Sequence, residues 1–162
     1  MEQDDKELKR AKNSAYRFLT IRPRSRYEVE HKLQDRDFPS DIITSVIDHL
    51  IRLGYLDDRR FAAQWAASRV RTRGFGRRRI EQELYTKGIS RELITDTLRE
   101  LFCDEPELDV ARKEAEKKLR SLGRFDPEVR KRRLAGHLER KGFPAEIIGK
   151  VLRETGRDRR EP

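Results

Sequence analysis

The chain has 162 residues, of which 35% are hydrophobic and 43% are charged, and its formal net charge is +9. Its mean hydropathy of −0.97 indicates too few apolar residues for one thick core but enough for several thin ones. An apolar run of about 18 residues is absent, the acidic start resembles no export signal, and the single cysteine, Cys103, excludes an intrachain disulfide, so we expect a soluble cytoplasmic protein without membrane contact.

The first third of the chain predicts three helices. The first has an amphipathic face formed by Leu8, Ala11, Ala15 and Phe18. Ser25 and Glu28 form a capping box at the start of the second, whose buried residues are Val29 and Leu33. A turn follows, in which Asp37 closes this helix and Ser40 is the expected N-cap of the next. The apolar face of the third helix consists of Ile42, Ile43, Val46, Ile47, Leu50 and Ile51.

The middle of the chain repeats this order. The segment Gly54-Tyr55-Leu56-Asp57-Asp58 ends with an aspartate that serves as an N-cap. The next helix has an apolar face formed by Phe61, Ala62, Trp65, Ala66 and Val70. The loop Gly74-Phe75-Gly76 leads to a helix with Ile80 and Leu84 at buried positions. After a turn at Gly88 and Ser90, a third apolar face is formed by Leu93, Ile94, Thr97, Leu98, Leu101 and Phe102.

The last third shows the same elements with weaker patterns. Residues 104–107 form a junction that contains a proline and no apolar residue. Three further helices are indicated by Ala111, Ala115, Leu119 and Leu122, then by Leu134 and Leu138, then by Ile147, Ile148, Val151 and Leu152. Gly142 ends the second of them, and a charged tail occupies residues 156–162.

These elements form one unit that occurs three times. Equivalent segments begin at Leu33, Leu84 and Leu138, at spacings of 51 and 54 residues. We therefore predict an all-α protein with three tandem three-helix repeats that form an elongated, curved array. The predicted repeats comprise residues 1–56, 57–103 and 107–155.

Positive charge is concentrated in the later repeats. Lysine and arginine exceed aspartate and glutamate by 5 in residues 58–103 and by 4 in residues 104–162, whereas residues 1–57 are balanced. The densest cluster surrounds the Gly74-Phe75-Gly76 loop, which we expect to be a basic tip. Its members are Arg69, Arg71, Arg73, Arg77, Arg78 and Arg79. In the last repeat, Arg132 and Arg133 are equivalent to Arg78 and Arg79.

Two interpretations of these arginines are open. Arg77 can pair with Glu81 and Arg79 with Glu83 at i, i+4, and a solvated helix face is the commoner role for any single arginine. For the cluster as a whole we favour a binding role, with Arg71 and Arg78 as the strongest candidates. Phe75 could stack on a base or wedge into a partner, and it could equally fold back onto its own helices.

Other residue patterns predict neither a cofactor nor a catalytic site. Asp57 and Asp58 lack a third hard ligand at a defined spacing, and helix capping explains them. The histidines His31, His49 and His137 fall at different repeat positions without zinc-type spacing. With no phosphate loop, nucleophile elbow or acid pair, we predict no metal, no cofactor and no enzymatic activity.

Several of these residues resemble the motifs of one family. The run from Gly54 to Asp58 and Arg60-Phe61-Ala62, then Gly74-Phe75-Gly76, Ile80 and Glu83-Leu84, and finally Lys87-Gly88-Ile89-Ser90, are similar to the RecX family of recombination regulators. The similarity covers nearly the whole chain and is densest in the middle repeat. Its structural motif residues are Tyr55, Leu56, Asp57, Asp58, Phe61, Gly76, Leu84 and Gly88.

The resemblance implies a modulator of the RecA recombinase built from three tandem three-helix units. Such a protein binds in the helical groove of the RecA filament on single-stranded DNA and stops its growth or promotes its disassembly. It thereby modulates recombination, repair and the SOS response, and brings no catalytic residues. We expect the partners to be RecA and single-stranded DNA, the latter contacted directly or through RecA, and the protein to be a monomer.

Two other functions are consistent with the residues. Each unit could act as a helix-turn-helix that binds DNA without RecA, in which case log K falls steeply with log salt. The array could also serve as an adaptor for an unrelated acidic partner.

Overall fold

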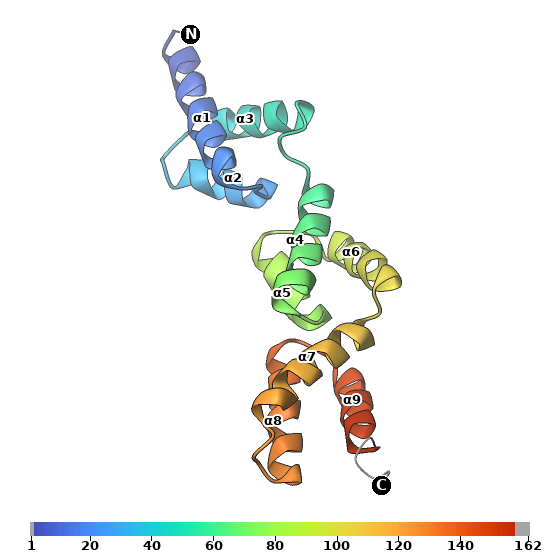
Figure 1. Ribbon diagram of the computed structural model, residues 1–162. Coiled ribbons are helices and arrows are strands. Elements are labelled where there is room, and N and C mark those ends of the chain that lie inside the picture. Colours follow the sequence, from blue (N-terminus) through green and yellow to red (C-terminus); the bar gives the residue numbers. More distant parts are fainter. Residues whose placement is uncertain (1, 158–162) are drawn as a thin grey trace.

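The computed structural model describes residues 2–157, with side chains from Asp4 to Gly156, and this part of the chain is built from helices (Figure 1). Apart from Gly156 and the backbone of residue 157, the predicted charged tail lies outside the described residues. Unit 1 contains α1 (Glu2–Ile21), α2 (Arg26–Gln34) and α3 (Ser40–Arg52). Unit 2 contains α4 (Asp58–Arg73), α5 (Arg77–Thr86) and α6 (Arg91–Asp104). Unit 3 contains α7 (Glu107–Ser121), α8 (Pro127–Arg140) and α9 (Ala145–Arg157). The predicted all-α, three-helix repeats are confirmed.

Local side chains fix several helix starts. Ser25 and Glu28 form the predicted capping box of α2, and Ser90 accepts a hydrogen bond from the Leu93 amide at 3.3 Å. The prediction that Ser40 is an N-cap is wrong. Pro39 occupies that position and Ser40 is the first residue of α3, because the chain enters the helix one residue earlier.

The turn between the second and third helix has the same geometry in each unit. Asp37, Gly88 and Gly142 all have a positive φ, of 58°, 74° and 89°. Such a residue closes the preceding helix and reverses the chain within a few residues. The chain therefore reverses through a left-handed residue between the second and third helices of all three units.

The helix pairs that pack most extensively belong to the same unit. Between Asp4 and Gly156, the buried side chains nevertheless form two cores, not three. Unit 1 has its own core, which includes Val29, Leu33 and Leu50, whereas the buried side chains of units 2 and 3 form one continuous cluster. Phe143 belongs to this shared cluster and is only 1% exposed. The connection between units 2 and 3 is therefore partly apolar.

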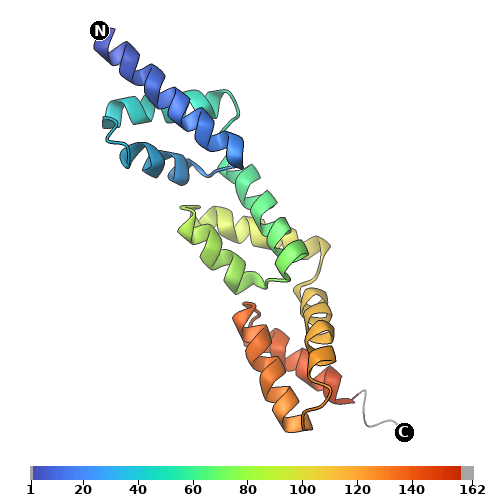
Figure 2. The ribbon, with the colours of Figure 1, turned by 60° about the vertical axis from the view of Figure 1, so that its left-hand side comes forward.

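The three units follow one another along an elongated molecule, with the first and last helices at opposite ends (Figures 1 and 2). Between consecutive units the contacts are made by helix ends and turns, since the extensive helix pairs lie within units. In the described part of the chain, no helix is long and apolar enough to cross a membrane.

Candidate partner interface

The basic cluster lies at the end of α4 and the start of α5, where unit 2 meets unit 3. Its loop is not the free tip that the charge pattern suggests. The Gly76 amide donates to the Lys141 carbonyl at 2.9 Å, and the Arg78 amide donates to the Gly142 carbonyl at 3.0 Å. The loop is thus part of a junction between units.

Arg69 is held within unit 2. Its Nε donates to Glu83 Oε2 at 2.6 Å, and its guanidinium lies 4.2 Å from the centroid of the Trp65 ring. The Trp65 indole donates to the same carboxylate oxygen at 2.9 Å. Arg69 can therefore lie on the apolar face of α4. Its guanidinium covers the Trp65 ring, and the Glu83 carboxylate neutralises the positive charge.

Arg77 pairs across the junction. The i, i+4 pair with Glu81 that the sequence predicts is not found among the described residues. The Arg77 backbone amide donates to Glu107 Oε1 and the Arg77 Nε donates to Glu107 Oε2, both at 2.7 Å. Glu107 is only 6% exposed. The first carboxylate of α7 therefore caps the first turn of α5, and a charge-assisted pair of this geometry outcompetes a solvated i, i+4 contact.

Phe75 folds back onto the protein. Its ring packs against the shared core of units 2 and 3. The Arg79 guanidinium lies 5.3 Å from the ring centroid and the Lys141 ammonium 5.7 Å from it. Arg79 also pairs with Glu83 at 3.7 Å, as its i, i+4 spacing predicts.

Three arginines of the cluster point to solvent. Arg71, Arg73 and Arg78 are exposed, and their side chains have no ion pair among the described residues. In unit 3, Arg132 is exposed in the same way, whereas the Arg133 guanidinium covers the Phe125 ring at 4.1 Å. Arg71, Arg73, Arg78 and Arg132 are therefore the candidates available to a partner.

Close backbone approach fixes the second junction. A Cβ on Gly142 would overlap the backbone of Arg79, and a Cβ on Gly76 would lie 2.7 Å from the Gly142 carbonyl oxygen and the Phe143 ring. Lys141 Nζ completes the contact by donating to the Arg73 carbonyl at 2.6 Å. No larger residue fits at either glycine without separating units 2 and 3.

The first junction uses equivalent elements. Ser25 Oγ donates to the Lys87 carbonyl at 2.6 Å, and a Cβ on Gly88 would overlap Tyr27. The Arg26 amide at the start of α2 donates to Asp58 Oδ1 at 2.8 Å. In both junctions, an acidic residue from the first turn of one unit caps the middle helix of the preceding unit. Burial raises the pKa of Asp58, an effect that the Arg26 amide opposes.

A carboxylate shielded from solvent lies at each junction. Half-buried Glu28 pairs with Lys87 across the first junction at 2.9 Å, whereas buried Glu114 pairs at 3.1 Å with Lys141 of its own unit, the residue that donates to the Arg73 carbonyl of unit 2. Burial alone would raise the pKa of Glu28, but hydrogen bonds from Arg22, Lys87 and the Ser25 amide lower it overall. For Glu114, burial is likewise outweighed by hydrogen bonds from Lys117 and Lys141, so its pKa is lowered.

The residues of the predicted family motif have structural positions. Asp57 caps α4 through the Arg60 amide at 3.0 Å, and Tyr55 is 55% exposed, with its ring edge-on to Tyr16. The core contains Leu56, Phe61 and Leu84, and the junctions contain Asp58, Gly76 and Gly88.

The contacts of Glu107, Glu114 and Lys141 at the second junction were not predicted. Repetition was a signal for one of them, because Lys141-Gly142 stands where Lys87-Gly88 stands in the preceding unit. Glu107 lies in the predicted junction 104–107, but its partner Arg77 is 30 residues away, and no local pattern indicates that pair.

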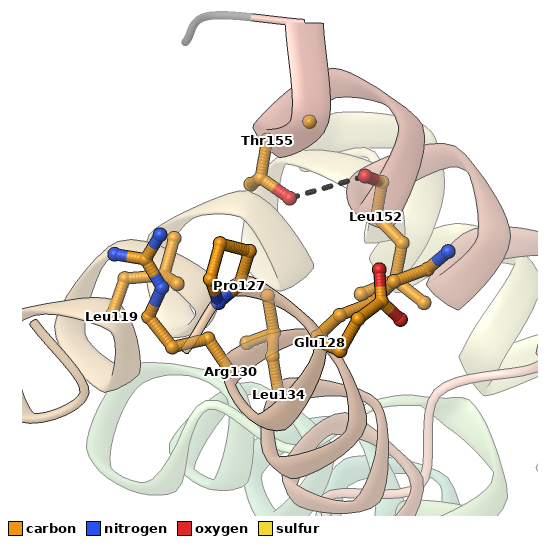
Figure 3. Close-up of a pocket in the computed structure, with 9 residues that line it drawn as sticks. Leu119, Pro127, Glu128, Arg130, Leu134, Leu152 and Thr155 are labelled. Atoms are coloured by element: carbon orange, nitrogen blue, oxygen red, sulfur yellow. Dashed lines mark hydrogen bonds between the residues drawn. The ribbon is translucent and has the colours of Figure 1, made fainter. Parts of the chain in front are cut away.

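A separate hollow of about 330 Å³ lies at the far end of unit 3 (Figure 3). The apolar side chains of Leu119, Leu134 and Leu152 line it, together with Thr155, whose hydroxyl donates to the Leu152 carbonyl at 3.2 Å. At the equivalent positions of unit 2, Leu101 and Phe102 stand in place of Thr155 and Gly156, and both pack against the core. No predicted site residue lines this hollow, and the described residues contain no group of acidic, histidine or cysteine side chains that could hold a metal ion.

Family models match the three units in order. Models described as the first, second and third three-helix domains of RecX match residues 11–50, 57–98 and 105–152. Together these segments cover most of the chain.

Whole proteins show the same similarity. The chain is 33% identical over 155 residues to the regulatory protein RecX of Streptomyces coelicolor, covering 93% of this chain and 82% of that protein. It is 37% identical over 138 residues to regulatory protein RecX of Mycobacterium avium, covering 84% and 79%. The crystal structure of RecX from Lactobacillus salivarius superposes with a TM-score of 0.83 at 26% identity, covering 94% of this chain and 98% of that one. The chain belongs to the RecX family of regulatory proteins.

Proposed function

We propose that this protein regulates the RecA recombinase by binding in the helical groove of the RecA filament on single-stranded DNA. Bound there, it inhibits RecA by blocking filament extension or promoting disassembly, and so modulates recombination, repair and the SOS response. Membership of the RecX family is the observation that carries this proposal. It acts by binding and has no catalytic step.

The shape of the molecule supports a mechanism based on spacing. Both junctions join consecutive units through an inserted carboxylate cap and a close glycine contact, at Asp58 and Gly88 and then at Glu107 and Gly142. An array with two such joints presents its units at set positions along a filament. Since a ligand shifts a conformational equilibrium only through its differential affinity for the two states, the array favours the one filament geometry that matches its own spacing.

The exposed arginines are the proposed contacts. Arg78 and Arg132 occupy equivalent positions in units 2 and 3, at a spacing of 54 residues, and both face solvent without an ion pair among the described residues. Arg71 and Arg73 lie in the last turn of α4, and Arg78 lies in the first turn of α5. Successive units thereby offer positive charge at a repeated interval, which suits an acidic filament groove.

The direct test is the single-stranded-DNA-dependent ATPase of the cognate RecA, titrated with this protein. We expect the rate to fall at substoichiometric amounts, because one bound regulator affects a filament of many RecA subunits. A rate that does not change at any ratio refutes the proposed function.

A charge-reversed variant, Arg71→Glu with Arg78→Glu, tests the contact. Reversal should weaken inhibition, and Arg10→Glu is the matched control, because Arg10 is exposed on α1 without an ion pair among the described residues. Equal inhibition by both variants would return Arg71 and Arg78 to the role of solvated surface charges.

A further inference from the structure

Unit 2 contains a surface groove between α5 and the first turns of α6, where the backbone of Arg78 belongs to the second junction but its side chain does not. Its volume is about 480 Å³, and we call it the α5–α6 groove. Its lining residues are Arg78, Glu81, Gln82, Tyr85, Arg91, Ile94 and Thr95. Arg78, Gln82 and Tyr85 share one stripe of α5, and Arg91 is the first residue of α6.

Tyr85 is an exposed aromatic residue that the packing of unit 2 does not use. Its side chain is 62% exposed and has no ring contact or hydrogen bond among the described residues. The equivalent residues of units 1 and 3 are Gln34 and Glu139, so the fold does not need an aromatic ring at this position. An exposed tyrosine that the repeat does not require indicates a binding role specific to unit 2.

Two uncompensated arginines flank this ring. Neither Arg78 nor Arg91 has an ion pair among the described residues, and both are exposed. Seven residues separate Arg78 from Tyr85, which corresponds to about 10 Å along the helix axis. Arg91 lies beyond Tyr85, after the short turn that joins the two helices. The groove therefore presents a cation, an aromatic face and a second cation in sequence.

We propose that the α5–α6 groove binds single-stranded nucleic acid, with a base stacked on Tyr85 and flanking phosphates paired with Arg78 and Arg91. Stacking on a side chain requires an unstacked base, which a single strand offers and a duplex does not. An acidic peptide could pair with the arginines, but it would leave the ring between them unused. The inference rests on the proposed function only in that the strand of the filament is the natural ligand.

Glu81 is the acidic residue of the groove, and its replacement provides a second test. Glu81 is exposed and has no ion pair among the described residues, so its charge opposes a phosphate held at Arg78. Replacement of Glu81 by glutamine should therefore strengthen binding of a strand. A peptide ligand with basic residues would respond in the opposite direction.

The test is fluorescence anisotropy of a labelled oligo(dT) with the full chain, in the absence of RecA. Tyr85→Ala should weaken binding about tenfold, Tyr85→Phe should bind like the unmodified protein because the ring is kept, and Glu81→Gln should bind more tightly. The double variant Arg78→Gln with Arg91→Gln should reduce the slope of log K against log salt by about 1.4, at roughly 0.7 per phosphate. Arg10→Gln is the control for a lost charge outside the groove.

All the altered side chains are exposed, so we expect every variant to fold, and circular dichroism checks this. Absence of oligo(dT) binding by the unmodified protein would overturn the proposal, as would wild-type affinity of Tyr85→Ala. A Tyr85→Ala protein that binds oligo(dT) normally but loses affinity for the RecA filament would assign the groove to a protein contact instead. The RecA ATPase is measured separately, so failure to inhibit RecA with oligo(dT) binding intact contradicts only the proposed function.

Discussion

At the residue scale, two glycines with similar backbones have different roles. Gly54 and Gly142 have φ values of 74° and 89°, in the left-handed region that side chains disfavour. A Cβ on Gly54 would meet no atom within 4 Å, whereas a Cβ on Gly142 would overlap the backbone of Arg79 in the neighbouring unit. Gly54 only turns the chain, while Gly142 also allows two units to meet.

This difference can be measured. Gly54→Ala should lower the free energy of unfolding by about 1 kcal/mol, the cost of left-handed backbone alone. Gly142→Ala should lower it by about 2 kcal/mol or more, since the new methyl group must also displace the backbone of unit 2. Urea denaturation followed by circular dichroism gives both values. Equal losses would show that the close approach at Gly142 contributes nothing.

The junction carboxylates predict a pH dependence. The folded-state pKa values of Glu28 and Glu114 lie below the ordinary value of about 4.3. Their stabilisation is therefore fully present above that value and is lost as the pH falls through the lowered pKa. The melting temperature should decrease from about pH 5 to about pH 3, and Glu28→Gln should show a smaller decrease over that window.

The only tryptophan reports on the first junction during this titration. Trp65 lies 5.0 Å from the Lys87 ammonium, which pairs with Glu28. Its fluorescence should change over the same acid range, and this change should be reduced in Glu28→Gln. An identical pH profile for both proteins would contradict the assignment of the junction pair.

At the element scale, the middle helices of units 1 and 2 are each capped by a side chain of the following unit. Asp58 of α4 accepts the first amide of α2, and Glu107 of α7 accepts the first amide of α5. The turn before α9 adds an apolar contact at the second junction. Phe143 is 1% exposed and belongs to the core shared by units 2 and 3, whereas Ile89, its counterpart at the first junction, is buried in that same core and not in the core of unit 1.

Phe143→Ala should therefore destabilise units 2 and 3 together. We expect a loss of about 3–5 kcal/mol, the usual cost of deleting a buried phenylalanine. Phe38→Ala is the matched control and should cost less, because its ring is partly exposed. Hydrogen exchange locates the effect: Phe143→Ala should reduce amide protection in α4 to α9 and leave unit 1 protected. Loss confined to unit 3 would contradict a shared core.

The helices were predictable from the sequence, whereas the junctions were not. Periodic apolar residues such as Leu33, Leu84 and Leu138 report a buried helix face directly, and Ser25 and Glu28 form a local cap. Glu107 binds a residue 30 positions away, so no local pattern reveals it. The i, i+4 rule assigned Arg77 to Glu81 because it considers only one helix. The contact of the exposed Arg78 with a partner is a prediction that no local sequence pattern establishes.

At the scale of the whole molecule, the features that the units share and the features that differ between them have separate consequences. Both junctions use the same construction, and this sets the spacing of the units along the elongated array (Figure 2). The exposed side chains differ between units: the basic cluster with Arg71, Arg73 and Arg78 lies in unit 2, its equivalent Arg132 lies in unit 3, and the exposed Tyr85 has no aromatic counterpart in units 1 and 3. We propose that the shared junctions determine which RecA filament geometry the protein favours, and that the side chains that differ between units contact the ligand.

The RecA ATPase on single-stranded DNA, measured with the unmodified protein, Gly54→Ala and Gly142→Ala, tests this account most directly. All three are compared at a temperature where each is folded. We predict that the unmodified protein and Gly54→Ala inhibit at substoichiometric amounts, whereas Gly142→Ala inhibits less because its second junction is displaced. An unchanged ATPase with the unmodified protein, or equal inhibition by all three, would contradict it.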